Sequence, residues 1–341
     1  MPKTQITIPI FIPHLGCPHR CIFCNQWETS STRTIPDRNH VINKINLFLS
    51  KIKQSVERIE VAFFGGSFTA IDYEEQKKLL EAAFAFKKRG NLHDIRISTR
   101  PDCIDKECLQ FLKRYEVNTI ELGVQSFSNK VLTASGRGHT SVDVFNAIKL
   151  IKQFKFNFVI QLMPGLPDDT EEESIRSAEI SSMFNPSAIR IYPALVLNKT
   201  RLAEIYHSNE YKPLSLETAV ELCKKMFLLF QKNGIPVIRM GLHPFSQEEI
   251  HNIIDGPYHP SFGFLVKSRL KRDIMENKIN EILSNTFNSS INSIEIAIPF
   301  REKEEFIGNK KENISYLKRL YNNIEIDYNI NKEDDLEIKV S

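Results

Sequence analysis

Three cysteines near the N-terminus carry the clearest chemistry in the sequence. The segment GCPHRCIFCN (16–25) places Cys17, Cys21 and Cys24 in a C-x3-C-x2-C spacing, just after a short apolar run. One short loop of this kind can supply three thiolates to a 4Fe-4S cube and ligate three of its irons. The fourth iron then has no ligand from the loop and stays open to a small chelating molecule. We therefore expect these cysteines to bind one 4Fe-4S cluster.

A structural zinc site is the alternative for the same loop. His14 or His19 would then supply the fourth ligand. Zinc sites usually combine two cysteine knuckles, or one knuckle with a distant histidine pair, and the sequence has no second knuckle. The remaining cysteines lie in helical patterns, where inert buried thiols are expected: Cys103, Cys108 and Cys223. A non-catalytic metal-binding protein therefore remains a competing hypothesis, which metal content would test.

The composition is that of an ordinary globular protein. The 341 residues include 45 basic and 42 acidic side chains, which gives a net charge of +3 and indicates no general nucleic-acid binder. The apolar run at the N-terminus is too short to span a bilayer and lacks a cleavage site typical of a signal peptide. We expect a cytoplasmic protein with no membrane association.

Apolar strand patterns alternate with longer amphipathic patterns through the first two thirds of the chain. Strands are predicted over 6–14, 59–66, 95–99, 119–125, 158–165, 188–195 and 236–242. Helices are predicted over 37–56, 72–89, 105–115, 141–154, 170–183 and 215–233, with caps at Asp37, Asp72, Asp105, Ser141, Thr170 and Ser215. This alternation predicts a parallel sheet in a complete or partial (β/α) barrel, whose chemistry lies at the C-terminal strand ends.

The pattern changes after about residue 243. A loop-rich connection and a helix over 263–284 precede short strands and a helix that read as a small C-terminal α+β appendage. We expect a core barrel over 1–243, a connection over 244–285 and the appendage over 286–341.

Two strand-end segments add candidate binding residues. Gly65 and Gly66 follow the second strand, where the absence of side chains lets the backbone approach a ligand, although a tight turn explains the pair equally well. Arg137 and His139 lie in SGRGHT, where a guanidinium could hold an anionic group. The alternative for that segment is a helix-capping turn with a solvated arginine.

The cysteine loop together with Gly65-Gly66 resembles the radical S-adenosylmethionine (SAM) superfamily. ELGVQSFSNKVLTASGRGHT (121–140) and QLMPGLPDDT (161–170) resemble the radical SAM part of the Elongator catalytic-subunit family, over roughly residues 1–270. The resemblance implies a partial (β/α)6 TIM-like barrel that binds SAM at the strand C-termini. It implies an enzyme, an oxidoreductase or transferase, that cleaves SAM reductively to a 5′-deoxyadenosyl radical. An electron donor such as ferredoxin or flavodoxin would supply the electron.

The resemblance also assigns roles to individual positions. It places Gly65 and Gly66 at the SAM amino group, and polar side chains that end the third strand near the SAM carboxylate or ribose: Ser98, Thr99 and Arg100. Residues that end the fifth strand would flank the adenine: Gln161, Met163 and Gly165. Gln125 would line the cavity, and it joins Arg137 and His139 as a candidate catalytic residue.

The substrate stays open between two classes. The Elongator-like motifs favour RNA, with tRNA as a candidate, and a basic run in the predicted helix would be its footprint unless it is a solvated helix face: Lys267, Arg269, Lys271 and Arg272. Elongator subunits carry an acetyltransferase domain that we do not expect here, and its absence favours a small metabolite or tetrapyrrole. Coproporphyrinogen oxidases have a further cysteine where this chain has Gln26.

Overall fold

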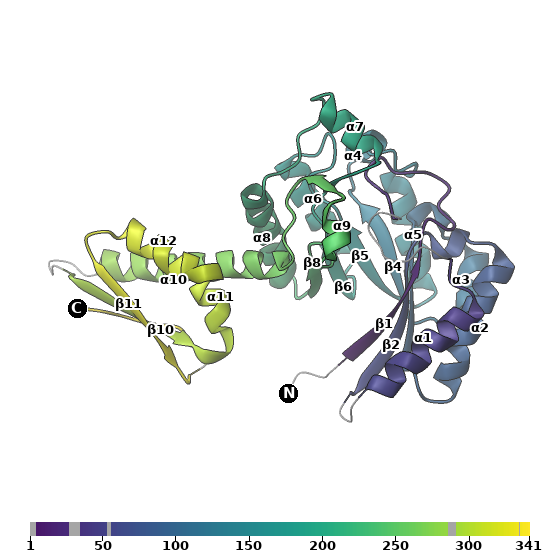
Figure 1. The fold of residues 1–341 in the computed structure, drawn as a ribbon, viewed down its shortest axis with the longest axis horizontal. Helices are drawn as coiled ribbons and strands as arrows, with labels where there is room; N and C mark the ends of the chain where they lie inside the picture. The colour runs from purple at the N-terminus through teal and green to yellow at the C-terminus, as the bar shows by residue number, and fades with distance from the viewer. Residues whose placement is uncertain (1–4, 27–34, 53–55, 286–290, 334) are drawn as a thin grey trace. The chain divides into compact units, whose positions relative to one another are not determined.

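A curled, seven-stranded parallel sheet forms the centre of the larger part of the protein. The computed structural model describes residues 5–26, 35–52, 56–285, 291–333 and 335–341. The sheet order is β1-β2-β3-β4-β5-β6-β8. Its strands are β1 (Gln5–Ile12), β2 (Arg58–Gly65), β3 (Asp94–Thr99), β4 (Thr119–Gln125), β5 (Asn157–Leu162), β6 (Ala188–Ile191) and β8 (Val237–Met240). This confirms the predicted partial barrel, with one parallel strand beyond six (Figure 1).

Helices connect successive strands of the sheet, and the last helix of this part follows the seventh strand. They are α1 (Arg38–Lys51), α2 (Tyr73–Lys88), α3 (Lys106–Arg114), α4 (Asn129–Ala134), α5 (Ser141–Gln153), α6 (Glu171–Met183), α7 (Arg201–His207), α8 (Leu216–Lys232) and α9 (Gln247–Ile250). The helix expected over 37–56 ends at Lys51, and residues 53–55 of that prediction lie outside the described residues.

Side-chain caps start most of these helices, as expected from the sequence. Asp37 accepts a hydrogen bond from the backbone of His40, and Asp72 accepts from Glu74 and Glu75. The cap expected at Ser141 was wrong by one residue. Thr140 caps α5 instead, because Asp143 accepts from the Thr140 N–H and hydroxyl and so forms a capping box.

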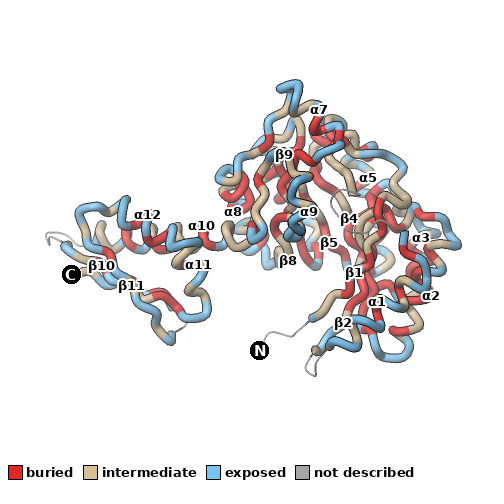
Figure 2. Tube along the Cα trace, viewed as in Figure 1, coloured by how far each residue is buried: buried red, intermediate tan, exposed pale blue. Residues whose placement is uncertain are grey.

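Alternation along the strands separates an apolar layer from a polar interior. Ile8 and Ile10 of β1, and Ile95 and Ile97 of β3, are fully buried on one side of the sheet. Figure 2 shows buried residues following the strands through this part of the chain. The opposite side of the strands carries charged residues that are also buried, such as Glu60. An interior with polar side chains is suited to a ligand rather than to a sealed core.

The buried charges of the interior form a connected network. Arg96 Nη2 lies 2.7 Å from Glu60 Oε1, and Arg96 Nη1 lies 3.5 Å from Glu121 Oε2. Arg190 Nε lies 3.1 Å from the same Glu121 oxygen. Buried charges are tolerated when each has an opposite partner, and these two carboxylates and two guanidiniums meet that condition.

The chain divides into two compact units. One holds residues 1–219 and 226–258, and the other holds residues 220–225 and 259–341. The second unit contains α10 (Phe262–Asn285), β10 (Ser293–Pro299), α11 (Lys303–Ile307), α12 (Glu312–Leu320), β11 (Glu325–Asn331) and β12 (Glu337–Val340), with its own apolar core. The boundaries expected at residues 243 and 285 stay a prediction.

The basic run on α10 is paired with acidic groups of its own unit. Lys267 lies 3.4 Å from Glu305, and Lys271 lies 2.7 Å from Glu302. Arg269 and Arg272 both pair with Glu221. These partners offset part of the charge of the run, and its role as an RNA footprint stays a prediction. Among the described helices, none is both long enough and apolar enough to cross a membrane.

Candidate active site

A cavity of about 750 Å³ brings the cysteine loop and the strand ends together. All three loop cysteines line it, and Cys17, Cys21 and Cys24 are each partly exposed. Nine other predicted site residues line the same cavity: Gly65, Gly66, Ser98, Thr99, Arg100, Gln125, Arg137, Gln161 and Met163. His139 and Gly165 do not line it. The volume falls in the range of about 300–1,000 Å³ found for ligand pockets.

The backbone of the cysteine loop is fixed from several sides. The Ile22 N–H donates to Ser135 O at 3.1 Å, and the Ile22 carbonyl accepts from Leu202 N at 2.8 Å. Within the loop, Cys24 N donates to Cys21 O at 3.1 Å. These bonds connect the residue between two of the cysteines to segments far along the chain. The loop is therefore shaped by the surrounding protein.

The arrangement of the thiols bears on the choice between a cube and a single ion. Among the described residues, no group of three His, Cys, Asp or Glu side chains is placed to hold one metal ion. His14 Nε2, a candidate zinc ligand, instead accepts a hydrogen bond from Gln26 N at 2.8 Å.

Burial disfavours the charged form of one thiol in the loop. It raises the pKa of Cys24 to about 12, and the neighbouring Cys21 and Cys17 thiols add to the effect. A metal-bound thiol is deprotonated because the cation stabilises the thiolate. The charge of bound iron would therefore be needed to make Cys24 a thiolate at neutral pH.

Two buried guanidinium groups face the Cys21 sulfur. Arg137 Nη1 lies 3.2 Å from Cys21 Sγ, and Arg100 Nη1 lies 3.9 Å from it. Arg137 also donates to the Gly123 carbonyl, and Arg100 is held by Asp102 through bonds of 3.0 and 2.9 Å. Arg137 is buried, so the alternative of a solvated arginine in a capping turn was wrong.

His139 lies beside this pair of arginines but outside the cavity lining. Its side chain is fully buried, and its Nδ1 lies 3.9 Å from Asp102 Oδ1. Burial lowers the pKa of His139 to about 3, with Arg137 and Arg100 adding to the effect, so the ring is neutral at physiological pH. The catalytic role expected of His139 stays a prediction, at a residue that lies outside the cavity lining.

The glycine pair packs directly against the cysteine loop. A Cβ on Gly66 would lie 2.1 Å from the Leu15 carbonyl oxygen, which no side chain could tolerate. Gly66 N donates to Ile12 O at 2.7 Å, and the Gly65 carbonyl accepts from Gln26 Nε2 at 2.8 Å. The tight packing explains why glycine is required at Gly66, independently of any role in SAM binding.

The third, fourth and fifth strands add polar groups to the cavity wall. Gln161 Nε2 donates to Gln125 Oε1 at 3.0 Å across the two strands. Ser98 Oγ is buried and has no hydrogen-bond partner among the described residues. Because an unpaired buried hydroxyl costs free energy, it marks a place where a ligand can supply the missing bond.

Gly165 lies in a turn that does not line the cavity. It adopts a φ of +84°, its N–H donates to Asp169 Oδ2 at 2.8 Å, and its carbonyl accepts from Tyr211 at 2.6 Å. A left-handed turn with both backbone groups occupied explains the glycine. The expected contact of Gly165 with adenine stays a prediction, at a residue outside the cavity lining.

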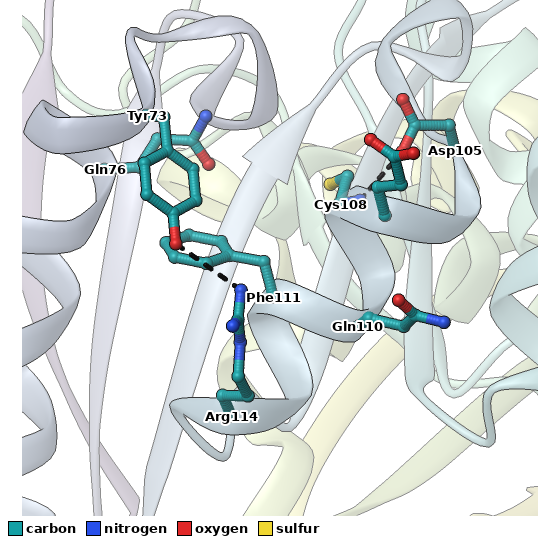
Figure 3. Close-up of a pocket in the computed structure, with 8 residues that line it drawn as sticks. Tyr73, Gln76, Asp105, Cys108, Gln110, Phe111 and Arg114 are labelled. Carbon is teal, nitrogen blue, oxygen red and sulfur yellow. Dashed lines mark hydrogen bonds between the residues drawn. The ribbon is translucent and has the colours of Figure 1, made fainter.

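A second pocket, of about 520 Å³, involves α2 and α3 and contains none of the predicted site residues. Figure 3 shows Tyr73 beside Phe111, with Arg114 Nη2 donating to the Tyr73 hydroxyl at 3.4 Å. Cys108, on the same side of α3 as Asp105, has a pKa raised to about 12 by burial, which makes it an unreactive thiol.

Comparison with known proteins identifies the family. The profile described as "Radical SAM superfamily" matches residues 11–179, and the one described as "Radical_SAM C-terminal domain" matches residues 186–272. An uncharacterized protein of Methanocaldococcus jannaschii is 30% identical over 228 residues, which cover 63% of this chain and 69% of that protein. The chain belongs to the radical SAM superfamily. It is therefore an enzyme of a superfamily that is characterised by a 4Fe-4S cluster and SAM.

Other relatives of this radical SAM protein are longer. The tRNA uridine(34) acetyltransferase of M. jannaschii is 32% identical over 60% of this chain and 45% of its own length. Elongator complex protein 3 of Homo sapiens is 27% identical over 64% of this chain and 48% of its own length. The chain thus spans about half the length of these two relatives.

Solved structures share the fold of this radical SAM protein. The archaeal Elp3 of Methanocaldococcus infernus, with its N-terminus deleted, superposes with a TM-score of 0.62 at 22% identity, over 81% of this chain and 63% of that one. Methylornithine synthase gives a TM-score of 0.50 at 17% identity, over 71% of this chain and 74% of that one. At these identities the likeness concerns the fold alone.

Sequence reasoning missed one residue that joins the parts of the site. Gln26 was noted only as the place where another class has a cysteine. Its backbone contacts His14, and its side chain contacts the Gly65 carbonyl. The position of Gln26, two residues after Cys24, was the available signal.

Proposed function

We propose that this protein binds one 4Fe-4S cluster through Cys17, Cys21 and Cys24 and cleaves SAM reductively to abstract hydrogen from a substrate. The observation that carries the proposal is the shared cavity. Three thiols from one loop open into the same space as the strand-end residues that the superfamily resemblance assigns to SAM. The donor set fits the cluster, because three soft thiolates leave one iron corner for a further ligand.

Different residues of the cavity would bind and orient the cluster and SAM. The cluster and SAM together supply the electron-driven bond cleavage that generates the 5′-deoxyadenosyl radical. Arg137 and Arg100 donate toward the Cys21 sulfur and orient the groups beside it. The unpaired Ser98 hydroxyl and the Gln125–Gln161 pair offer hydrogen bonds from the cavity wall. Gly65 and Gly66 keep the wall next to the loop free of side chains, and an electron donor such as ferredoxin or flavodoxin would supply the electron.

Product formation from SAM tests the proposal directly. Protein reconstituted without oxygen and mixed with SAM and dithionite should yield 5′-deoxyadenosine, and Cys21→Ala should yield none. Cys108→Ala is the matched control, because that thiol lies outside the cavity, and it should retain both iron and product formation. A preparation that binds zinc, or iron that does not respond to SAM, would contradict the proposal.

We further propose RNA, in particular tRNA, as the substrate class. The support is the similarity to proteins named tRNA uridine(34) acetyltransferase and Elongator complex protein 3. Deuterium transfer from labelled tRNA into 5′-deoxyadenosine would test this choice. Transfer from a labelled small metabolite, with none from tRNA, would contradict it.

A further inference from the structure

Two arginines stand side by side on neighbouring strands of the barrel. Arg190 of β6 and Arg239 of β8 are paired in register, and both line the cavity. Register partners on parallel strands point to the same side of the sheet. Two like charges in this relation destabilise the sheet unless something opposite in charge lies near them.

Arg190 has such partners within the protein. Its Nε lies 3.1 Å from Glu121 Oε2, and its Nη1 donates to the Tyr192 hydroxyl at 2.7 Å. Its guanidinium also stacks on Phe64, 5.2 Å from the ring centre. Glu121 is already shared with Arg96. The buried carboxylates Glu60 and Glu121 are therefore already paired with Arg96 and Arg190.

Arg239 has no such partner among the residues that the structure describes. No carboxylate there lies within ion-pair distance of it, and its one hydrogen bond runs from Nε to Gly241 O at 3.3 Å. The other acidic residue in the cavity lining, Glu249, accepts a hydrogen bond from Ser246 N at 2.9 Å and closes the capping box of α9. One nitrogen of Arg239 is thus held by the backbone, and its two terminal nitrogens form no ion pair with the described residues.

The whole lining has an excess of positive charge. Of the described residues that line the cavity, two are glutamates and six are cations: Arg20, Lys44, Arg100, Arg137, Arg190 and Arg239. Arg100 and Arg137 face the Cys21 sulfur, so cluster thiolates would balance them. Arg239 has neither a thiol nor a carboxylate as its counterpart.

We propose that Arg239 binds an anionic group of the substrate, a carboxylate or a phosphate, at the β8 side of the cavity. A guanidinium offers two parallel N–H donors that match either anion, and its backbone bond restricts its orientation. The inference rests on the proposed function, because it assumes that the cavity holds a substrate together with SAM. It adds to that function the chemical class of one substrate group, an anion, which would bind at β8, the seventh parallel strand.

Anion binding by the reconstituted protein, with SAM present at saturation, tests this site. The probes are acetate, inorganic phosphate and an oligouridylate, which separate a carboxylate, a small phosphate and a polynucleotide source. None of them contains adenine, so none imitates the adenosine part of SAM. Isothermal titration calorimetry gives the affinities for the native protein and for Arg239→Gln, Arg239→Lys and Arg176→Gln. Arg176, exposed on α6, is the control arginine.

We expect the native protein to bind at least one probe, and Arg239→Gln to weaken that binding about tenfold or more, as loss of a charge-assisted bond should. Arg239→Lys keeps the charge and should weaken it less, and Arg176→Gln should have no effect. The site is overturned if no probe binds the native protein, if Arg239→Gln binds as the native protein does, or if Arg176→Gln loses as much. Thermal melts show whether each variant is folded.

The two proposals fail in different ways. A native protein that yields 5′-deoxyadenosine but binds no probe overturns the Arg239 site and leaves the proposed function standing. A native protein that yields no 5′-deoxyadenosine overturns the proposed function, whatever the titrations give.

Discussion

Arg137 Nη1 lies 3.2 Å from Cys21 Sγ, so a buried cation donates directly toward a sulfur that we assign to the cluster. Hydrogen bonds and positive charge near ligating sulfurs raise the reduction potential of an iron–sulfur cluster. The same arginine also bonds to the Gly123 carbonyl, which fixes the direction of its donors.

Replacing Arg137 should therefore make the cluster harder to reduce. Arg137→Met removes both the positive charge and the hydrogen-bond donors. A loss of about 1 kcal/mol in the stabilisation of the reduced cluster relative to the oxidised one corresponds to a drop in reduction potential on the order of 50 mV. A redox titration followed by electron paramagnetic resonance measures it. Arg137→Lys retains the charge and should shift the potential less. An unchanged potential in Arg137→Met would show that the arginine only packs there.

Gly66→Ala should disrupt the cysteine loop through a backbone clash. The added methyl group would lie 2.1 Å from Leu15 O, so either the loop or the end of β2 must move. We expect a lower melting temperature and a lower iron content after reconstitution. Gly90→Ala is the control, because its Cβ meets no atom within 4 Å and its φ of +75° alone costs about 1 kcal/mol. Equal losses in both variants would contradict the packing argument.

The stability of the cluster-free protein should fall in mild acid because of His139. Its folded-state pKa of about 3 lies below the ordinary histidine value of 6.5, so between these values the unfolded chain binds a proton that the folded chain does not. The unfolding free energy should then decrease as the pH falls below 6.5, by up to about 1.4 kcal/mol per pH unit from this group. Urea unfolding at pH 7 and pH 5 measures the difference.

His139→Gln should reduce that pH dependence, whereas His207→Gln, at an exposed position, should keep it. The same dependence in all three proteins would assign the acid sensitivity to other groups.

Glu121→Gln should destabilise the barrel interior. The change leaves Arg190 buried without a carboxylate, and breaking a buried pair from one side costs about 3 kcal/mol. Glu74→Gln removes an exposed ion pair with Lys77 and should cost less than about 1 kcal/mol. Chemical denaturation of both variants gives the comparison, and a Glu121→Gln protein as stable as the control would refute the role given to the network.

The positions of the strands along the chain were predictable because the local hydrophobic pattern determines where each strand lies. Each predicted strand of the large sheet is present, with ends that shift by up to four residues, as 188–195 against Ala188–Ile191 shows. Short elements without a hydrophobic period were missed, such as α4 and the two-stranded sheet of β7 (Val196–Leu197) and β9 (Ile253–Asp255). Their stability comes from contacts with distant segments, which a local pattern does not contain.

The site was predictable where residue type alone limits the chemistry. The spacing of three cysteines identifies their common loop, but nothing in SGRGHT distinguishes the cavity-lining Arg137 from His139, which is buried outside the lining. The pairing of Arg239 with Arg190 depends on the register of β6 and β8. Strand register between distant segments is set by the assembled sheet, so these relations required the structure.

The two backbone bonds of Ile22 have a consequence for the biogenesis of the enzyme. Ser135 and Leu202 hold the middle of the cysteine loop by main-chain contacts that need no metal. We therefore expect the chain to complete its barrel before it receives iron and sulfide, as a late maturation step. The cluster-free protein would then be folded when an assembly scaffold delivers the cluster to it.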